Sequence, residues 1–247
     1  MVIVTGGTHG IGEAVVRRLA AAGEHVLFTG RDEAAGAALE AALAGVTFMR
    51  SDVSIEQDCI DAVARAMELG GGKLKGLVNN AGTSSRAKFH EAAIEDWDRV
   101  FAANARSTFL FSREALPGLI AARGAVVNVS SIAGKVGEEG LAIYCASKAA
   151  VLGLTQALAL EYGKDVRFNA VCPGQIATRM MDQVIADSAR LAALTYRIPA
   201  GRLAAPAEVA EAIYWLLSPA ASYVNGAVLS VDGGETAGLR TPAQSRP

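Results

Sequence analysis

Three polar residues in the middle of the chain have the types and spacing of an acid/base site. Tyr144 and Lys148 lie four residues apart in residues 142–162, a stretch whose pattern predicts a helix, so both side chains would share one helix face. Ser131 lies 13 residues before Tyr144, where the apolar strand pattern of residues 125–129 ends. Because open α/β sheets bind ligands at the ends of their strands, a hydroxyl, a phenol and an ammonium would meet there.

A tyrosine can act as a base near neutral pH only if its pKa is lowered. Lowering the pKa of a phenol from about 10 by about 3 units requires about 4 kcal/mol of preference for the phenolate. One ammonium at about 4 Å, in an effective dielectric of about 20, supplies about that much. The spacing therefore predicts that Lys148 lowers the pKa of Tyr144. The alternative is an ordinary pair of helix neighbours.

Composition and charge exclude several classes of function. The chain has 247 residues, 51% of them apolar, with 23 basic and 25 acidic side chains and three cysteines. Without a basic run we expect no nucleic-acid partner, and without a long uncharged apolar run no membrane span. No charged segment precedes the first apolar residues, so we expect no signal peptide. The scattered cysteines suit reduced thiols in a cytoplasmic protein, and the histidines lack metal-ligand spacing, so we expect no metal site.

Short β-branched runs alternate with helical patterns along the chain. Strands are predicted at residues 2–5, 25–29, 46–49, 74–79, 125–129, 166–171 and 227–231. Helices are predicted at residues 13–22, 33–43, 55–69, 95–116 (where Pro117 and Gly118 could bend the chain), 142–162 and 206–217, with helical pieces in a mobile segment at 178–198. The alternation predicts a single-domain, doubly wound (Rossmann) parallel sheet of about seven strands with helices on both faces. Residues 1–234 would form this domain, and residues 235–247 a loose tail.

A glycine-rich turn joins the first strand to the first helix. Gly6, Gly10 and Gly12 would let the backbone approach a pyrophosphate, whose charge lies at the positive end of the helix. The spacing is T-G-x-x-x-G-x-G, so the general G-x-G-x-x-G fingerprint does not strictly match. A glycine-rich turn without a ligand is the alternative, but the strand before it and the helix after it favour dinucleotide binding.

Six motifs in order give the sequence a specific resemblance. It resembles the short-chain dehydrogenase/reductase family, including its 3-oxoacyl-carrier-protein-reductase-like members, over about residues 2–234. The matching stretches are T-G-G-T-H-G-I-G at residues 5–12, N-N-A-G at residues 79–82, P-G at residues 173–174 and D-G-G at residues 232–234. The family's four catalytic residues match Asn104, Ser131, Tyr144 and Lys148. Two departures are a first strand without the usual leading residues and Ala103 in place of a commoner valine.

The resemblance implies a role for each matching residue. Ser131 would donate a hydrogen bond to a carbonyl oxygen, and Tyr144 would protonate the developing alkoxide. Lys148 would hold the nicotinamide ribose and lower the Tyr144 pKa, while Asn104 would hold a water that relays protons to solvent. Ordinary hydrogen bonding is the alternative for Ser131 and Asn104. The implied cofactor contacts are Gly6, Thr8, His9, Gly10, Ile11, Gly12, Arg31, Asp52, Val53, Asn80, Ala81, Gly82, Tyr144, Lys148, Pro173, Gly174, Ile176 and Thr178.

The end of the second strand favours NADP(H), with NAD(H) as the alternative. An acidic residue there would bind the 2′-hydroxyl of NAD and repel a 2′-phosphate, but the chain has Gly30 followed by Arg31, and arginine forks onto phosphate. A protonated His9 could help. Asp32 could take the ribose if it turned inward, although its better interpretation is the cap of the next helix. Asp52 matches the family position that hydrogen-bonds adenine, and a helix cap is an equal alternative.

These features predict reduction of a ketone or oxidation of a secondary alcohol. Enoyl reductases of the superfamily have a longer gap between tyrosine and lysine, so double-bond reduction is not expected. An NAD-dependent secondary-alcohol, polyol or steroid dehydrogenase is one alternative. A non-catalytic dinucleotide-binding sensor or scaffold is another, although such proteins usually lose one of the catalytic residues. The candidate residues for the substrate pocket lie at 83–90, 137–143 and 175–200. They mix apolar and charged side chains, so the identity of the substrate stays open.

The resemblance also implies a homo-oligomer, with a tetramer favoured. Relatives pair the helix that carries the tyrosine and lysine with its copy in another subunit. Val151, Leu154 and Leu158 recur at helical spacing and could form such a contact face. Packing of these side chains on the protein's own sheet is the alternative.

Overall fold

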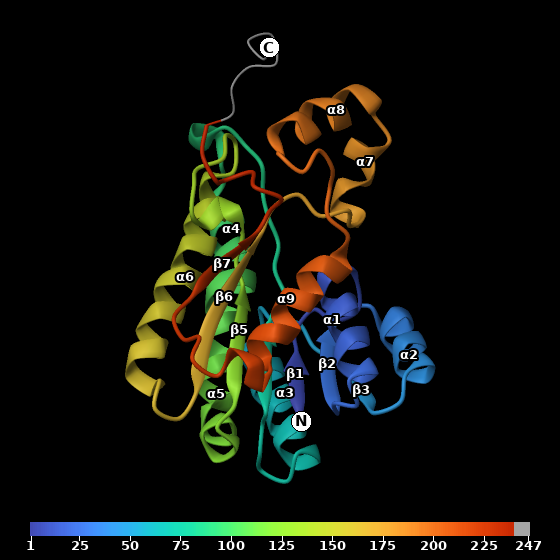
Figure 1. Cartoon of the computed structure of the whole chain (residues 1–247), viewed down its shortest axis with the longest axis vertical. Helices are drawn as coiled ribbons and strands as arrows, with labels where there is room; N and C mark the ends of the chain where they lie inside the picture. The colour runs from blue at the N-terminus through green and yellow to red at the C-terminus, as the bar shows by residue number, and fades with distance from the viewer. Residues whose placement is uncertain (240–247) are drawn as a thin grey trace.

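Seven parallel strands form the central sheet of the computed structural model, which describes residues 1–239 except for the side chain of Met180 (Figure 1). Their order across the sheet is β3-β2-β1-β4-β5-β6-β7, which confirms the predicted doubly wound fold. The strands are β1 Val2–Val4, β2 Val26–Gly30, β3 Val46–Arg50, β4 Gly76–Asn79, β5 Ala125–Val129, β6 Arg167–Pro173 and β7 Val228–Val231.

The direction in which the chain adds strands reverses between β1 and β4. From β1 it builds outward through β2 to β3, then returns to place β4 on the other side of β1. The loops at the carboxyl ends of β1 and β4 therefore lead away to opposite faces and leave a crevice between them. Such a switch point is where open α/β sheets bind ligands.

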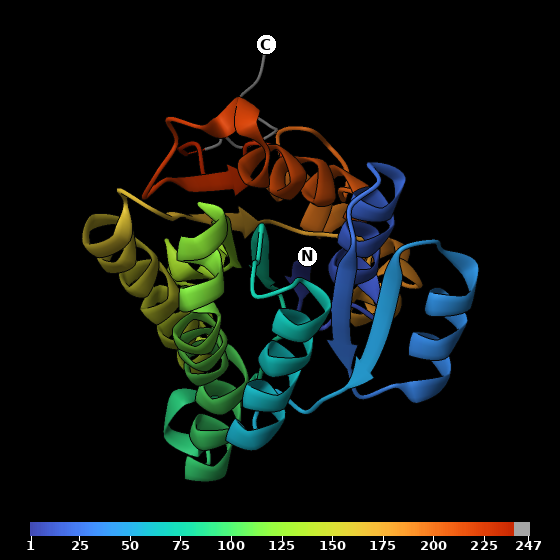
Figure 2. The same ribbon diagram turned by 90° about the horizontal axis from the view of Figure 1, so that it is seen from below.

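Two hydrophobic cores lie on the two faces of the sheet. Successive strand residues point to opposite faces, so Val2 and Val4 pack in one core and Ile3 in the other. Helices α1 Gly10–Ala21, α2 Glu33–Ala42 and α9 Pro206–Leu217 cover the first face. Helices α3 Glu56–Leu69, α5 Ser107–Ala122 and α6 Ala142–Tyr162 cover the second, and Figure 2 shows the two layers from below.

The predicted helix 95–116 is a longer, three-part element. Helix α4 Ile94–Phe101 passes into a π-helical turn, Ala102–Arg106, and then into α5. The predicted last residue, Leu116, is wrong, because α5 continues to Ala122 with Pro117 inside it. A proline removes one backbone N–H from the helix, but here the packing of buried neighbours such as Leu119 holds the helix together.

The segment after β6 forms short helices at the carboxyl end of the sheet. The turn Arg179–Met181 leads into α7 Asp182–Ile185 and α8 Ser188–Arg197, which stand beyond the sheet in Figure 1. The predicted helical pieces are therefore present. Three further short turns are Phe89–Glu91, Ile132–Gly134 and Pro219–Ala221.

The predicted tail begins with an anchored residue. The side chain of Glu235 is only 4% exposed and forms an ion pair with Arg197 of α8 at 2.8 Å. This pair ties the chain after β7 to the 178–197 segment. Residues 240–247 of the predicted tail lie outside the described residues.

Candidate active site

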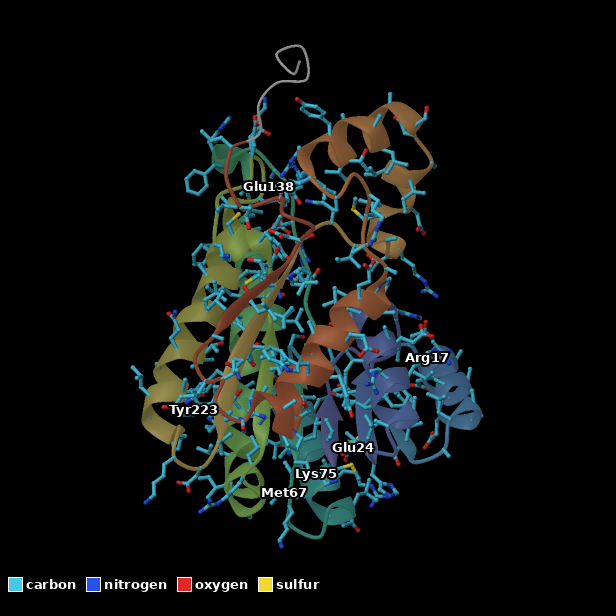
Figure 3. All side chains as sticks on the ribbon, in the orientation of Figure 1. Arg17, Glu24, Met67, Lys75, Glu138 and Tyr223 are labelled. Carbon is cyan, nitrogen blue, oxygen red and sulfur yellow. The ribbon has the colours of Figure 1, made fainter. Side chains whose placement is uncertain are left out.

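A cavity of about 990 Å³ opens along the carboxyl ends of the strands. Glu138, which lines it, lies at this end of the molecule, whereas the Lys75–Glu24 ion pair marks the opposite end (Figure 3). Nearly all of the predicted site residues line this cavity. The exceptions are Gly12 and Asn104. The wall also includes residues that carried no predicted role: Ser51, Ser54 and Arg99.

Ser131, Tyr144 and Lys148 converge on the cavity from β5 and α6. Ser131 follows β5, and its Oγ accepts a hydrogen bond from the backbone N–H of Ala133 at 3.1 Å, which caps the turn there. The Tyr144 hydroxyl hydrogen-bonds Ser131. Lys148, one helical turn further along α6, is buried, and its Nζ lies 5.8 Å from the centre of the Tyr144 ring. Its ammonium donates to the backbone oxygen of Val129 at 2.9 Å.

The ionisation of Tyr144 differs from the prediction. Burial raises the pKa of Tyr144, and the hydrogen bond with Ser131 only partly opposes it. Burial also lowers the pKa of Lys148, to about 8. The predicted lowering of the Tyr144 pKa by Lys148 is therefore not seen, because desolvation of the phenolate is the larger effect. Tyr144 is a protonated phenol at neutral pH, which suits it to donate a proton.

Asn104 holds the wall of the cavity rather than lining it. It is 1% exposed and lies in the π-helical turn. Its Oδ1 accepts from the N–H of Thr83 at 2.8 Å, and its Nδ2 donates to the Thr83 oxygen at 2.9 Å and to Ser147 Oγ at 2.8 Å. Both amide hydrogens are thus used to tie the loop after β4 to α6. The water-holding role stays a prediction.

The glycine loop is built for close backbone approach. Gly6 and Gly10 have φ of +64° and +58°, values that favour glycine. The side-chain amide of Asn80 donates to the oxygens of Thr5 and Gly6 at 3.0 Å each, which fixes the loop to the strand β4. Gly12 does not line the cavity, because it lies where α1 packs against the loop itself, and a Cβ there would overlap the Gly6 oxygen.

These features fit a dinucleotide. The cavity begins at the N-terminus of α1, whose free N–H groups favour phosphate. Ser51, on the cavity wall, has a buried Oγ with no hydrogen-bond partner among the described residues. At Gly82 a Cβ would lie 3.2 Å from Lys148 Nζ, so the missing side chain leaves room beside the ammonium. The site thus offers phosphate-binding, polar and cationic groups along one groove.

Position 30, the last residue of β2, has no room for a side chain of any kind. A Cβ at Gly30 would lie 2.6 Å from Thr8 Cγ2. The next residue, Arg31, is 75% exposed, with Nη1 3.8 Å from Asp52 Oδ2. Asp32 accepts from the N–H of Ala35 at 3.0 Å, which confirms it as the cap of α2.

Asp52 forms a local turn instead of capping a helix. Its Oδ1 accepts from the N–H and Oγ of Ser54 at 3.0 and 2.7 Å, and the residue at the start of α3 is Ile55. The helix-cap alternative for Asp52 is therefore wrong. The carboxylate lines the cavity beside Arg31, which leaves its predicted contact with adenine open.

A contact between His9 and Arg179 was not predicted. His9 Nε2 lies 2.9 Å from Asp32 Oδ2 and 3.1 Å from Arg179 Nη1. Arg179 immediately follows Thr178, a predicted cofactor contact. The sequence showed only a charged residue in a segment of mixed character, because its partner is 170 residues away.

A family model described as Enoyl-(Acyl carrier protein) reductase matches residues 6–236. The chain is 38% identical over 247 residues to 2-(S)-hydroxypropyl-CoM dehydrogenase 3 of Xanthobacter autotrophicus, covering 96% of both chains. The chain belongs to the short-chain dehydrogenase/reductase family. Its relatives are dehydrogenases and reductases of alcohols or ketones. This chain is therefore an oxidoreductase of the CH–OH/C=O class, in a family that binds NAD(P).

Two further comparisons extend this result. The chain is 41% identical over 233 residues to inactive 2-(S)-hydroxypropyl-CoM dehydrogenase 2 of Xanthobacter autotrophicus, and the match covers 90% of this chain and all of that protein. The Pseudomonas aeruginosa RhlG/NADP active-site complex aligns with a TM-score of 0.89 and 32% identity, covering 95% of each chain. One relative is thus named inactive, and one structural neighbour holds NADP.

Proposed function

We propose that this protein is an NADP(H)-dependent reductase of ketones, or dehydrogenase of secondary alcohols, that uses Tyr144 as its proton donor. The observation that carries the proposal is the convergence of Ser131, Tyr144 and Lys148 on a cavity that begins at the glycine loop. A phenol and a hydroxyl in mutual contact can both donate to one oxygen atom. A carbonyl oxygen that becomes an alkoxide is such an acceptor.

Each catalytic side chain has one task in this scheme. A bound nicotinamide dinucleotide supplies the hydride. Ser131 donates a hydrogen bond to the substrate oxygen, and the protonated Tyr144 transfers its proton to that oxygen as negative charge develops. Lys148, with a pKa of about 8, is mostly charged at pH 7, so it stabilises the phenolate left behind and would hold the nicotinamide ribose. Asn104 keeps the loop and α6 at a fixed separation.

The charge at the end of β2 supports NADP(H) over NAD(H). Gly30 brings no carboxylate, and the exposed guanidinium of Arg31 faces the cavity. Asp32, the group that could bind a free ribose, is engaged by His9 and by the first turn of α2. The structural neighbour with bound NADP agrees with this preference.

Replacing Arg31 by aspartate is expected to lower the affinity for NADPH at least tenfold relative to NADH, because a carboxylate repels the 2′-phosphate and accepts from a free ribose. Fluorescence titration of each nucleotide measures both affinities. Arg17→Asp reverses a charge outside the cavity (Figure 3) and is the matched control. An unchanged ratio of the two affinities in Arg31→Asp would refute the cofactor assignment.

Two other activities deserve a direct comparison in the same assay. The matched family model names enoyl reduction, but Tyr144 and Lys148 lie one helical turn apart on α6, the spacing expected for carbonyl reduction. An enoyl thioester tested beside ketones separates the two. The relative that is named inactive favours testing turnover itself, since a dinucleotide-binding sensor would bind NADPH without reducing any ketone.

We also propose a cytoplasmic homo-oligomer, most simply a tetramer. Val151 is buried and Leu158 packs against the second core, so the contact face suggested by the sequence is turned inward. Helix α6 is also the one helix among residues 1–239 that is long and apolar enough to span a membrane by composition alone. A second subunit would cover its outer, uncharged face. The exposed residues of that face are Ala146, Ala149, Ala150, Gly153, Gln156, Ala157 and Leu160.

A second apolar surface supports a tetramer rather than a dimer. Trp215, on α9, is 41% exposed. Tyr223, which Figure 3 labels, is fully exposed. Tyr223 lies in the stretch between α9 and β7, the edge strand at the opposite end of the sheet from β3. Two separate two-fold contacts generate a tetramer. The three free cysteines suit a reducing compartment.

Introducing arginine at Ala150 is expected to dissociate the oligomer, because the new charge would be buried without a partner in the α6 contact. Light scattering after size-exclusion chromatography measures the mass. Ala38→Arg, at an exposed position on α2, is the control and should keep the wild-type mass. A wild-type mass for Ala150→Arg would exclude α6 from the interface.

A further inference from the structure

Arg179 brings a guanidinium from the segment after β6 onto the glycine loop. It follows Thr178, whose Cγ2 lies 3.2 Å from the position that a Cβ of Gly10 would occupy. The segment after β6 therefore rests on the start of α1. The guanidinium reaches further, to within 3.1 Å of the ring nitrogen Nε2 of His9. Both side chains line the cavity together with Arg31.

The partner of Arg179 in this structure is a poor one for a cation. His9 Nε2 faces Arg179 Nη1 at 3.1 Å and Asp32 Oδ2 at 2.9 Å. One ring nitrogen carries either a hydrogen or a lone pair. With a hydrogen it donates to Asp32 and presents an N–H to the arginine. With a lone pair it accepts from Arg179 and turns that pair toward the carboxylate as well. One of the two contacts is unfavourable in either state.

Arg31 is in a similar situation at the same end of the cavity. Its nearest carboxylate oxygen, on Asp52, lies 3.8 Å away, beyond hydrogen-bond distance. Two guanidiniums thus flank the end of β2, one from the residue that follows the strand and one from the 178–197 segment. Each has hydrogen-bond donors to spare. A phosphate monoester, with three strong acceptor oxygens, can satisfy both forks at once.

We propose that Arg179 binds the 2′-phosphate of NADP(H) together with Arg31. The inference rests on the proposed function, because the phosphate belongs to the proposed cofactor. Phosphate binding would free His9 to donate to Asp32 without an opposing N–H. The same contact would fix the 178–197 segment, whose Met181 and Val184 line the cavity, against the cofactor. Arg179 is therefore a specificity-determining residue that reaches the adenosine end from the segment after β6.

Two adenosine nucleotides without a nicotinamide test this inference apart from turnover. Adenosine 2′,5′-bisphosphate carries the 2′-phosphate, and adenosine 5′-monophosphate lacks it. Calorimetric titration of Arg179→Gln is expected to give about tenfold or more loss of affinity for the bisphosphate and less than about twofold for the monophosphate. Arg179→Lys, which keeps the charge but not the fork, should lie between Arg179→Gln and the wild type.

The control is Arg190→Gln on α8. Arg190 belongs to the same segment, pairs with Asp187 at 3.2 Å and does not line the cavity. The Arg190→Gln variant should bind both nucleotides as the wild type does. An equal loss for both nucleotides in Arg179→Gln would place the guanidinium on the 5′-phosphate and overturn the inference, as would no loss at all. Failure of the wild-type protein to bind either nucleotide would instead count against the proposed function.

Discussion

Tyr144→Phe is expected to lower turnover with a ketone by about 10²- to 10⁴-fold, because it removes the proton that the developing alkoxide must receive. Burial raises the pKa of Tyr144, so the wild-type phenol carries this proton throughout the neutral range. The affinity for NADPH should stay within about twofold, since Lys148 and the glycine loop are unchanged. Steady-state oxidation of NADPH measures turnover, and fluorescence titration measures affinity.

Tyr162→Phe is the matched control for this experiment. Tyr162 ends the same helix, α6, at a distance from the cavity, and the same hydroxyl is removed. We expect wild-type turnover from it. Wild-type-like turnover in Tyr144→Phe would contradict the mechanism, because phenylalanine has no hydroxyl group that could donate the proton.

Gly12→Ala is expected to abolish dinucleotide binding and to lower the free energy of unfolding by about 1–3 kcal/mol or more. The new Cβ would overlap the carbonyl oxygen of Gly6 and lie 2.5 Å from Asn80 Nδ2. The Asn80 Nδ2 donates a hydrogen bond to the Gly6 oxygen at 3.0 Å, so neither atom can move without breaking the contact between the loop and β4. The loop must shift, and its phosphate-binding N–H groups shift with it.

Chemical denaturation and nucleotide titration measure the two effects of Gly12→Ala. Gly137→Ala is the control, because no heavy atom lies within 4 Å of its added Cβ. Its stability should stay within about 1 kcal/mol of the wild type. If Gly12→Ala kept both the stability and the nucleotide affinity of the wild type, the loop would not be the rigid cradle that the site requires.

The layers of the fold could be predicted from local patterns, but the places where some helices are interrupted or end could not. Buried apolar runs and helical periodicity are local properties, so the alternation of strands and helices was readable. The π-helical turn Ala102–Arg106 inserts between α4 and α5 without a change of composition. Pro117 is a strong local signal for a helix end, and here the tertiary packing of α5 overrides it.

The candidate site divides in the same way. Ser131, Tyr144 and Lys148 converge because a strand end and a single helical turn place them, and both rules act over a few residues. The contacts of Asn104 with Thr83, and of Arg179 with His9, join residues far apart in the chain. The pKa of Tyr144 depends on its burial, which only the folded protein sets. The prediction considered only the charge of Lys148, so it gave the wrong direction for the shift of the Tyr144 pKa.

Titration of the wild-type protein with the two nucleotides tests directly whether the cavity binds NADP(H). The purified protein is titrated separately with NADPH and NADH, and the change in fluorescence gives both affinities. We expect tight binding of NADPH and at least tenfold weaker binding of NADH, since Arg31 and Arg179 face the cavity at the end of β2. Binding of neither nucleotide would contradict the proposal that this cavity is the site of a nicotinamide-dependent reductase.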